Sequence, residues 1–215
     1  MTSIVMLVGD LGGGKTTLAC WFNEWIQQEF PNVPKVANTA FKSAVKYEDP
    51  NKFIAIKLIK QDKRYAFVTT DEGAQAGFES RGSGSKRAAL ESRVISLARK
   101  AHVDWIIITQ LMSMIDKRGQ WLANFYILCE AVFEADNFTP WPDYFEYTVY
   151  DHNLDELGGF EITWANAEAY LFPRMDTDDV PFAETLKAQW LKYYDISTED
   201  EASFEEIMVP RIVAN

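Results

Sequence analysis

The stretch that decides the fold is Ile4–Thr17, IVMLVGDLGGGKTT, in which a short apolar run is followed at once by a glycine-rich segment. It matches the pattern G-x-x-x-x-G-K-[ST] at Gly9, Gly14, Lys15 and Thr16. Glycines let the backbone curl so that successive N–H groups point at phosphate oxygens. The stretch therefore predicts a phosphate-binding loop between a strand and a helix.

The charged and hydroxyl residues of this loop each have a chemical task. We expect Lys15 to neutralise the β- and γ-phosphates of a nucleotide and the Thr16 hydroxyl to bind Mg²⁺. The helix that follows adds the positive end of its dipole to the anion site. Apolar side chains at helical spacing predict that helix: Leu18, Phe22, Trp25 and Ile26. The residues expected to contact the nucleotide are Gly9, Asp10, Leu11, Gly12, Gly13, Gly14, Lys15, Thr16 and Thr17.

Composition narrows the class of protein. The 215 residues are 47% hydrophobic and 14% aromatic, which is typical of a globular chain of one domain, with or without an appendage. Neither a signal-peptide pattern nor an apolar run near the roughly 20 residues of a membrane span is present, so we expect a cytoplasmic chain without stable membrane insertion. The 2 cysteines and 2 histidines are too few and too scattered for a disulfide framework or a metal site of these residues.

The charge is distributed unevenly along the chain. The net charge is −11, yet residues 1–129 hold 17 basic and 12 acidic side chains, while residues 130–215 hold 4 basic and 20 acidic ones. Such asymmetry indicates one part that faces a polyanion and one that is solvated. The densest basic segment is 81–100, with Glu91 as its single acid. Its basic residues are Arg81, Lys86, Arg87, Arg93, Arg99 and Lys100.

Alternating strand and helix patterns predict an α/β fold with a mainly parallel central sheet flanked by helices. After the first helix we expect strands at 34–39, 65–70 and 103–109. The segment 50–59 is ambiguous, and a helix opened by Asp49-Pro50 is favoured because parallel strands need a crossover between them. A flexible basic loop at 80–86 precedes a helix with one apolar stripe, made by Leu90, Val94, Leu97 and Ala101.

The C-terminal half carries weaker patterns. We expect a helix over 122–134 and a β-hairpin formed by 144–150 and 160–164, with its turn at Gly158-Gly159. A last helix is expected at 182–194, followed by an acidic tail. The predicted organisation is a single domain over 1–195, comprising a core over about 3–118 and the hairpin and last helix over about 140–195, with a tail at 196–215.

Two strand ends complete the candidate site. Asp71 ends a strand 56 residues after Lys15, where a Mg²⁺ ligand belongs, and the adjacent Glu72 can polarise a water for in-line attack. Gln110 ends the next buried strand, where an amide can hydrogen-bond the γ-phosphate or the attacking water. Thr69-Thr70 makes the end of the strand before Asp71 less apolar than is usual for such a pair.

These elements together resemble the FtsK–HerA superfamily of P-loop ATPases, with a RecA-like fold. The resemblance rests on the Walker A segment Gly9–Thr16, the Walker B pair at 71–72, and the segments Leu97–Ala101 and Ile106–Gln110. It covers about residues 3–118 and is greatest to the genome-packaging NTPases of archaeal turreted icosahedral viruses. It implies ATP as the nucleotide, hydrolysis assisted by Lys15, and a homo-oligomer, expected to be a hexameric ring, that moves double-stranded DNA. It also implies a capsid or vertex protein as partner, in the cytoplasm of a host cell or transiently at the virion vertex.

The resemblance further implies an arginine that reaches a neighbouring subunit's site and stabilises the transition state. Arg99 matches best, since it precedes Gln110 by 11 residues. The alternatives are Arg81, Arg93 and Arg118. The basic loop then becomes a candidate DNA contact, in which side chains bind phosphates without reading bases: Arg81, Lys86 and Arg87.

Three other functions remain open. An assembly or secretion ATPase resembling the zonula-occludens-toxin group would act on protein, although that group usually carries a membrane segment. A nucleotide kinase would use the segment 81–100 as a lid, although Glu72 and Gln110 fit hydrolysis by water better. A nucleotide-gated adaptor without enzymatic activity is disfavoured by the intact Glu72.

Overall fold

The computed structural model describes residues 2–47, 49–71, 94, 96–112, 117–134 and 139–175, with the side chains at 118 and 119 excepted. Several predicted features therefore lie outside the described residues. They are the basic loop at 80–86, most of the helix after it, the helix at 182–194 and the acidic tail.

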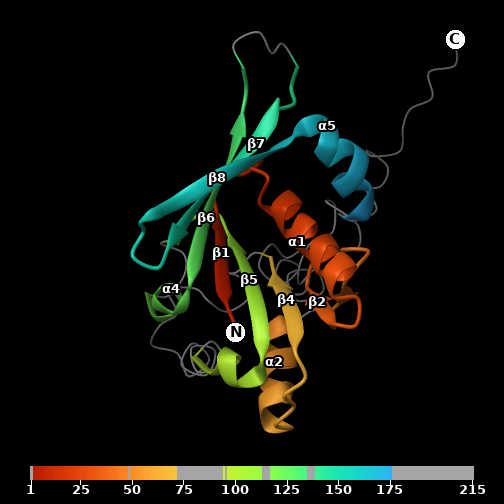
Figure 1. Ribbon diagram of the computed structural model, residues 1–215, viewed down its shortest axis with the longest axis vertical. Helices are drawn as coiled ribbons and strands as arrows, with labels where there is room; N and C mark the ends of the chain where they lie inside the picture. The colour runs from red at the N-terminus through yellow and green to blue at the C-terminus, as the bar shows by residue number, and fades with distance from the viewer. Residues whose placement is uncertain are drawn as a thin grey trace, which may run out of the picture. The chain divides into compact units, whose positions relative to one another are not determined.

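The described strands form one eight-stranded sheet in the order β3-β2-β4-β5-β1-β6-β7-β8 (Figure 1). Their bounds are β1 Ile4–Val8, β2 Lys35–Ala37, β3 Val45–Lys46, β4 Ala66–Thr70, β5 Val103–Thr109, β6 Phe125–Val132, β7 Tyr144–Asp151 and β8 Glu156–Thr163. In that order the strands from β3 to β6 pair in parallel, whereas β7 and β8 are antiparallel additions at one edge. The mainly parallel α/β sheet with flanking helices is confirmed.

The order of the strands brings the predicted site together. Strand β5 lies between β1 and β4, with Val8 paired to Thr109 and Thr70 paired to Ile107. The carboxyl ends of these parallel strands therefore meet at one edge of the sheet, which is where open α/β sheets bind ligands.

Helices cover both faces of the sheet, as the pattern on β5 requires. The helices are α1 Lys15–Glu29, α2 Pro50–Ile59, α4 Lys117–Leu122 and α5 Trp164–Asn166, with shorter turns η3 Ala98–Ala101, η5 Ala167–Leu171 and η6 Phe172–Arg174. Ile106 and Ile108 join one core cluster with Leu18 of α1, while Trp105 and Ile107 face the other side of the sheet. Figure 1 shows α1 running back alongside the sheet from the loop after β1.

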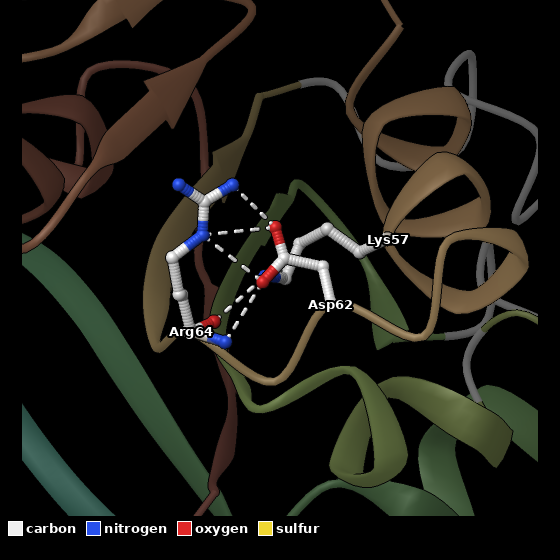
Figure 2. A network of polar contacts seen from close by, with 3 residues as sticks. All are labelled: Lys57, Asp62 and Arg64. Carbon is white, nitrogen blue, oxygen red and sulfur yellow. Dashed lines mark hydrogen bonds and ion pairs between the residues drawn. The ribbon is translucent and has the colours of Figure 1, made fainter.

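The predicted start of α2 is confirmed, and a polar network fixes its far end. Asp49 accepts a hydrogen bond from the Lys52 backbone N–H at 3.1 Å and so caps the helix. Figure 2 shows the network after the helix, where the buried Lys57 ammonium lies 3.7 Å from Asp62 and donates to the Arg64 carbonyl at 2.7 Å. Hydrogen bonds from Arg64 hold the pKa of Asp62 well below its usual range. This network secures the turn into β4.

The predicted helix over 122–134 is wrong. Helix α4 ends at Leu122, and the chain continues as β6, which pairs in parallel with β1 and antiparallel with β7. The sequence FYILCEAV has an apolar content that suits a helix or a buried strand equally well. Ladders on both sides satisfy its backbone groups, and this tertiary pairing decides in favour of the strand.

The predicted turn at Gly158-Gly159 is also misplaced. Both glycines lie within β8, and the chain reverses at residues 152–155 instead. The Asp151 carboxylate accepts hydrogen bonds from the backbone N–H groups of Asn153 and Asp155, at 2.7 and 3.0 Å, and so builds the turn. Gly158, with φ 136°, marks a register shift in the ladder with β7.

Candidate nucleotide-binding site

The glycine-rich loop between β1 and α1 is packed tightly on β6 and β7. A Cβ atom at Gly9 or Gly13 would lie 2.1 or 2.5 Å from the carbonyl oxygen of Cys129. Gly14 has the left-handed φ of 81°, and a Cβ there would lie 2.5 Å from a ring carbon of Phe145. Three glycines of the motif are therefore required by neighbouring strands as well as by the curl of the loop.

The lysine and the start of α1 lie as the motif predicts. Lys15 is buried, and its Nζ donates to the carbonyl oxygens of Gly9 at 2.8 Å and Asp10 at 2.6 Å. Helix α1 begins at Lys15, and the Leu18 N–H donates to the Gly14 carbonyl at 2.9 Å. N–H groups in the first turn of a helix lack intrahelical acceptors, so this loop combines an ammonium with backbone donors for an anion.

The predicted Mg²⁺ ligands come together from β4 and α1. The Thr16 hydroxyl donates to Asp71 Oδ2 at 3.4 Å, and the Thr39 hydroxyl donates to the same oxygen at 3.2 Å. Hard hydroxyl and carboxylate oxygens fit Mg²⁺, which usually takes one or two protein ligands beside phosphate oxygens and waters. Among the described residues no group of three or more His, Cys, Asp or Glu could hold a metal ion by itself. Thr16 and Asp71 therefore fit a Mg²⁺ ion whose remaining ligands are phosphate oxygens and waters.

Asn38, at the carboxyl end of β2, holds the main chain of Asp71 from both sides. Its Nδ2 donates to the Asp71 carbonyl at 2.9 Å, and its Oδ1 accepts from the Asp71 N–H at 2.7 Å. Both Asn38 and Thr39 are buried. Sequence reasoning placed them in a strand without assigning them a role. Two polar residues ending a strand next to the one that ends in Asp71 were the signal that could have found them.

The two threonines before Asp71 are explained by buried hydrogen bonds. Thr70 Oγ1 accepts from the indole N–H of Trp105 at 2.9 Å, and Thr69 Oγ1 accepts from Asn23 Nδ2 at 3.0 Å. Trp105 lies on β5 and Asn23 on α1, so these bonds tie the end of β4 to both neighbours. The polar strand end therefore positions Asp71.

Gln110 follows β5 and shares a pocket with the glycine-rich loop. This pocket has a volume of about 410 Å³, and Gln110, Gly9 and Asp10 are among the residues that line it. Glu130 and Phe133, from the end of β6 and the chain after it, contribute further walls. The structure thus brings Gln110 beside the loop, as its place in the sequence predicts, and its proposed contact with the γ-phosphate stays a prediction.

The predicted arginine finger lies far from the site of its own subunit. Arg99 is exposed on η3, at the amino end of β5, whereas Gln110 follows the carboxyl end. The seven residues of β5 separate the two by roughly 23 Å at about 3.3 Å per residue. Arg99 is therefore out of reach of the site in this chain. The side chain of Arg118 is not described. Five further predicted site residues lie outside the described ranges: Glu72, Arg81, Lys86, Arg87 and Arg93.

The underside of the loop is buried and uncharged. Burial raises the pKa of the Cys129 thiol to about 12, although the nearby Lys15 ammonium opposes the shift. Burial likewise raises the pKa of Tyr147, whose hydroxyl donates to the Gly14 carbonyl at 3.1 Å. Both groups are therefore protonated at neutral pH.

In the described ranges no helix has the length and apolarity to cross a bilayer.

Comparison with known proteins gives matches among solved structures. No protein-family model matches the chain, and no curated protein matches it. The genome packaging NTPase B204 from Sulfolobus turreted icosahedral virus 2, in complex with AMP, is similar over 75% of this chain and 98% of its own, with 14% identity and a TM-score of 0.52. The N-terminal domain of zonular occludens toxin from Neisseria meningitidis is similar over 76% and 94%, with 16% identity and a TM-score of 0.53.

The packaging NTPase is also similar to this chain in its complex with AMPPCP. That structure covers 72% of this chain and 95% of its own, with 14% identity and a TM-score of 0.51. At these identities the similarity establishes the fold. The chain has the fold of the P-loop NTPases, as the motifs predicted.

Proposed function

We propose that this chain is a Mg²⁺-dependent ATP hydrolase that works as a ring-shaped motor on double-stranded DNA and packages a viral genome. The observation that carries the proposal is the 3.4 Å contact between the Thr16 hydroxyl and Asp71, made where the glycine-rich loop meets β4. A loop alone indicates nucleotide binding. A loop joined to a fixed carboxylate, with Gln110 directly after the strand that lies between β1 and β4, is an arrangement suited to hydrolysis.

In this proposal each residue of the candidate site has a defined role. Lys15 and the backbone N–H groups of the loop bind the phosphates, while Thr16 and Asp71 hold Mg²⁺, which neutralises charge that develops on the phosphate oxygens. Glu72 follows Asp71 directly and accepts the proton of the attacking water. Gln110 donates to the γ-phosphate or orients that water.

The action on DNA rests on charge and on similarity. The basic residues of the segment 81–100 would contact DNA phosphates, with Arg81, Lys86 and Arg87 as the proposed contacts. The position of Arg99 at the amino end of β5, away from the site, suits a finger that acts on the neighbouring subunit in a ring, which we take to be a hexamer. The similarity to a genome packaging NTPase supports DNA as the substrate and a capsid or vertex protein as the partner.

A second candidate is an ATPase that acts on protein during phage assembly or secretion. The similarity to the N-terminal domain of zonular occludens toxin is as great as that to the packaging NTPase, with TM-scores of 0.53 and 0.52. The fold therefore does not separate the two functions. The basic segment favours DNA because arginine and lysine side chains bind the phosphates of a nucleic-acid backbone.

The experiment that tests the proposal is phosphate release from Mg²⁺-ATP by the purified chain, with and without long double-stranded DNA. We expect DNA to stimulate release, and Glu72→Gln to abolish it with or without DNA. The matched control is Glu29→Gln, the same substitution at the last residue of α1. Hydrolysis that ignores DNA would favour the protein-directed ATPase. Transfer of phosphate to an added nucleotide would make the chain a kinase and overturn the proposal.

A further inference from the structure

Strand β7 contacts the phosphate-binding loop through two aromatic residues. Tyr147 is fully buried, and its hydroxyl donates to the Gly14 carbonyl at 3.1 Å. Phe145, two residues earlier and on the same face of β7, packs against the Cα of Gly14, where a side chain would collide with its ring. A buried hydroxyl is costly without a partner, so the contact between Tyr147 and Gly14 is specified by both the strand and the loop.

The carbonyl that accepts this hydrogen bond belongs to the peptide unit joining Gly14 to Lys15. A peptide unit is planar, so the direction of the Gly14 carbonyl fixes the direction of the Lys15 N–H on its other side. Glycine has a wide choice of backbone angles, and sterics alone do not hold this plane. Two donors hold it here: the Tyr147 hydroxyl and the Leu18 N–H, the latter at 2.9 Å.

We propose that Tyr147 is a positioning residue of the nucleotide site, which acts through the Gly14 carbonyl to aim the Lys15 N–H at the phosphates. The proposal rests on the nucleotide binding proposed above. It assigns a role in that site to the antiparallel part of the sheet, far from every motif in the sequence. N–H donors that already point at the anion site lose little conformational entropy when the anion binds, and the affinity for the anion is therefore higher.

The role requires a hydroxyl that stays protonated and a ring that stays in place. Burial raises the pKa of Tyr147, so its hydroxyl remains a donor throughout the neutral range. Loss of one neutral hydrogen bond weakens an interaction by about 0.5–1.5 kcal/mol. We therefore expect a loss of about 2- to 12-fold in the affinity for phosphates, since 1.4 kcal/mol is tenfold.

The test compares Tyr147→Phe with Tyr126→Phe. Each variant keeps its ring and loses one hydroxyl that donates to a backbone carbonyl, Gly14 in the first case and Gln120 in the second. Dissociation constants for ADP and for tripolyphosphate, which has no base or sugar, are measured by calorimetry beside the melting temperature. Tyr147→Phe should weaken both ligands by the same factor. Tyr126→Phe should bind both like the wild type, although both variants melt at a lower temperature.

Two results would overturn the proposal while leaving the nucleotide site intact. They are wild-type affinity in a folded Tyr147→Phe variant, and equal losses in the two variants, which would reveal a general effect of destabilisation. A loss for ADP that is absent for tripolyphosphate would also contradict it, because the aimed N–H faces phosphate. If the wild-type chain binds neither ligand, the proposed nucleotide site fails first, and the inference with it.

Discussion

The hydrogen bonds between Asn38 and Asp71 allow the sharpest test of how the site is built. Asn38→Ala removes two hydrogen bonds, of 2.9 and 2.7 Å, from the main chain of Asp71. At about 0.5–1.5 kcal/mol each, the free energy of unfolding should fall by about 2 kcal/mol. For a chain of this size that corresponds to a melting temperature lower by roughly 4–8 °C.

The functional effect should be larger than the loss of stability suggests. Once its main chain is released, the Asp71 carboxylate no longer stays beside Thr16, and the Mg²⁺ ligands lose their alignment. Residues that support a metal ligand typically contribute about 10- to 100-fold to metal affinity. The assay is ADP binding by calorimetry with Mg²⁺ and with EDTA. We expect the gain in affinity due to Mg²⁺ to shrink by about tenfold or more in Asn38→Ala.

Asn124→Ala is the matched control for this variant. The Asn124 side chain also holds a main chain, since its Oδ1 accepts from the Ile4 N–H at 2.9 Å, at the amino end of β1 and away from the site. The variant should be destabilised and keep the gain due to Mg²⁺. An undiminished gain in Asn38→Ala, or an equal loss in Asn124→Ala, would refute the reasoning.

Three further predictions concern the loop, the finger and the thiols. Gly13→Ala would place a Cβ 2.5 Å from the Cys129 carbonyl oxygen, and such overpacking costs about 1–3 kcal/mol. ADP binding should therefore weaken by about 5- to 150-fold in a calorimetric titration, and unchanged affinity would contradict the packing. Arg99→Ala and Glu72→Gln should each be inactive alone. Mixing the two variants should restore part of the phosphate release, because some interfaces in the mixture join an intact Glu72 to the Arg99 of a neighbouring chain; no recovery would exclude action in trans. Burial raises the thiol pKa of Cys20 and Cys129 from 9.0 to about 12, so these thiols ionise at lower pH in the unfolded chain and the free energy of unfolding should fall between pH 9 and 12. Measured by urea titration, this fall should be shallower in the variant with both cysteines changed to alanine, and an equal slope would contradict the burial.

The parts of the fold that the sequence predicted correctly depend on short-range chemistry. The loop of Gly9–Thr16 is encoded within eight residues, and its glycines, lysine and threonine each have a local reason to be there. The start of α2 is specified by Asp49 and Pro50 within one turn. Strand β5 is predictable because the continuous apolar run Trp105–Ile108 is typical of a strand buried on both faces.

The parts that were missed depend on contacts distant in sequence. Strand β6 reads as a helix until its pairing with β1 and β7 is known. Asn38 lies 33 residues before Asp71, and Tyr147 lies 133 residues after Gly14. No local pattern connects such residues, since only the order of strands brings them together. The same holds for Arg99, whose distance from its own site became evident only when β5 was placed in the sheet.

The most direct test of the central claim is phosphate release from Mg²⁺-ATP by the wild-type chain and by Lys15→Ala. The control is Lys35→Ala, which removes another buried lysine whose Nζ donates to a backbone carbonyl, that of Val33 at 2.8 Å, outside the site. Release by the wild type and by Lys35→Ala, and its loss in Lys15→Ala, would be the predicted result. Absence of release from the wild type, or undiminished release by Lys15→Ala, would contradict the account.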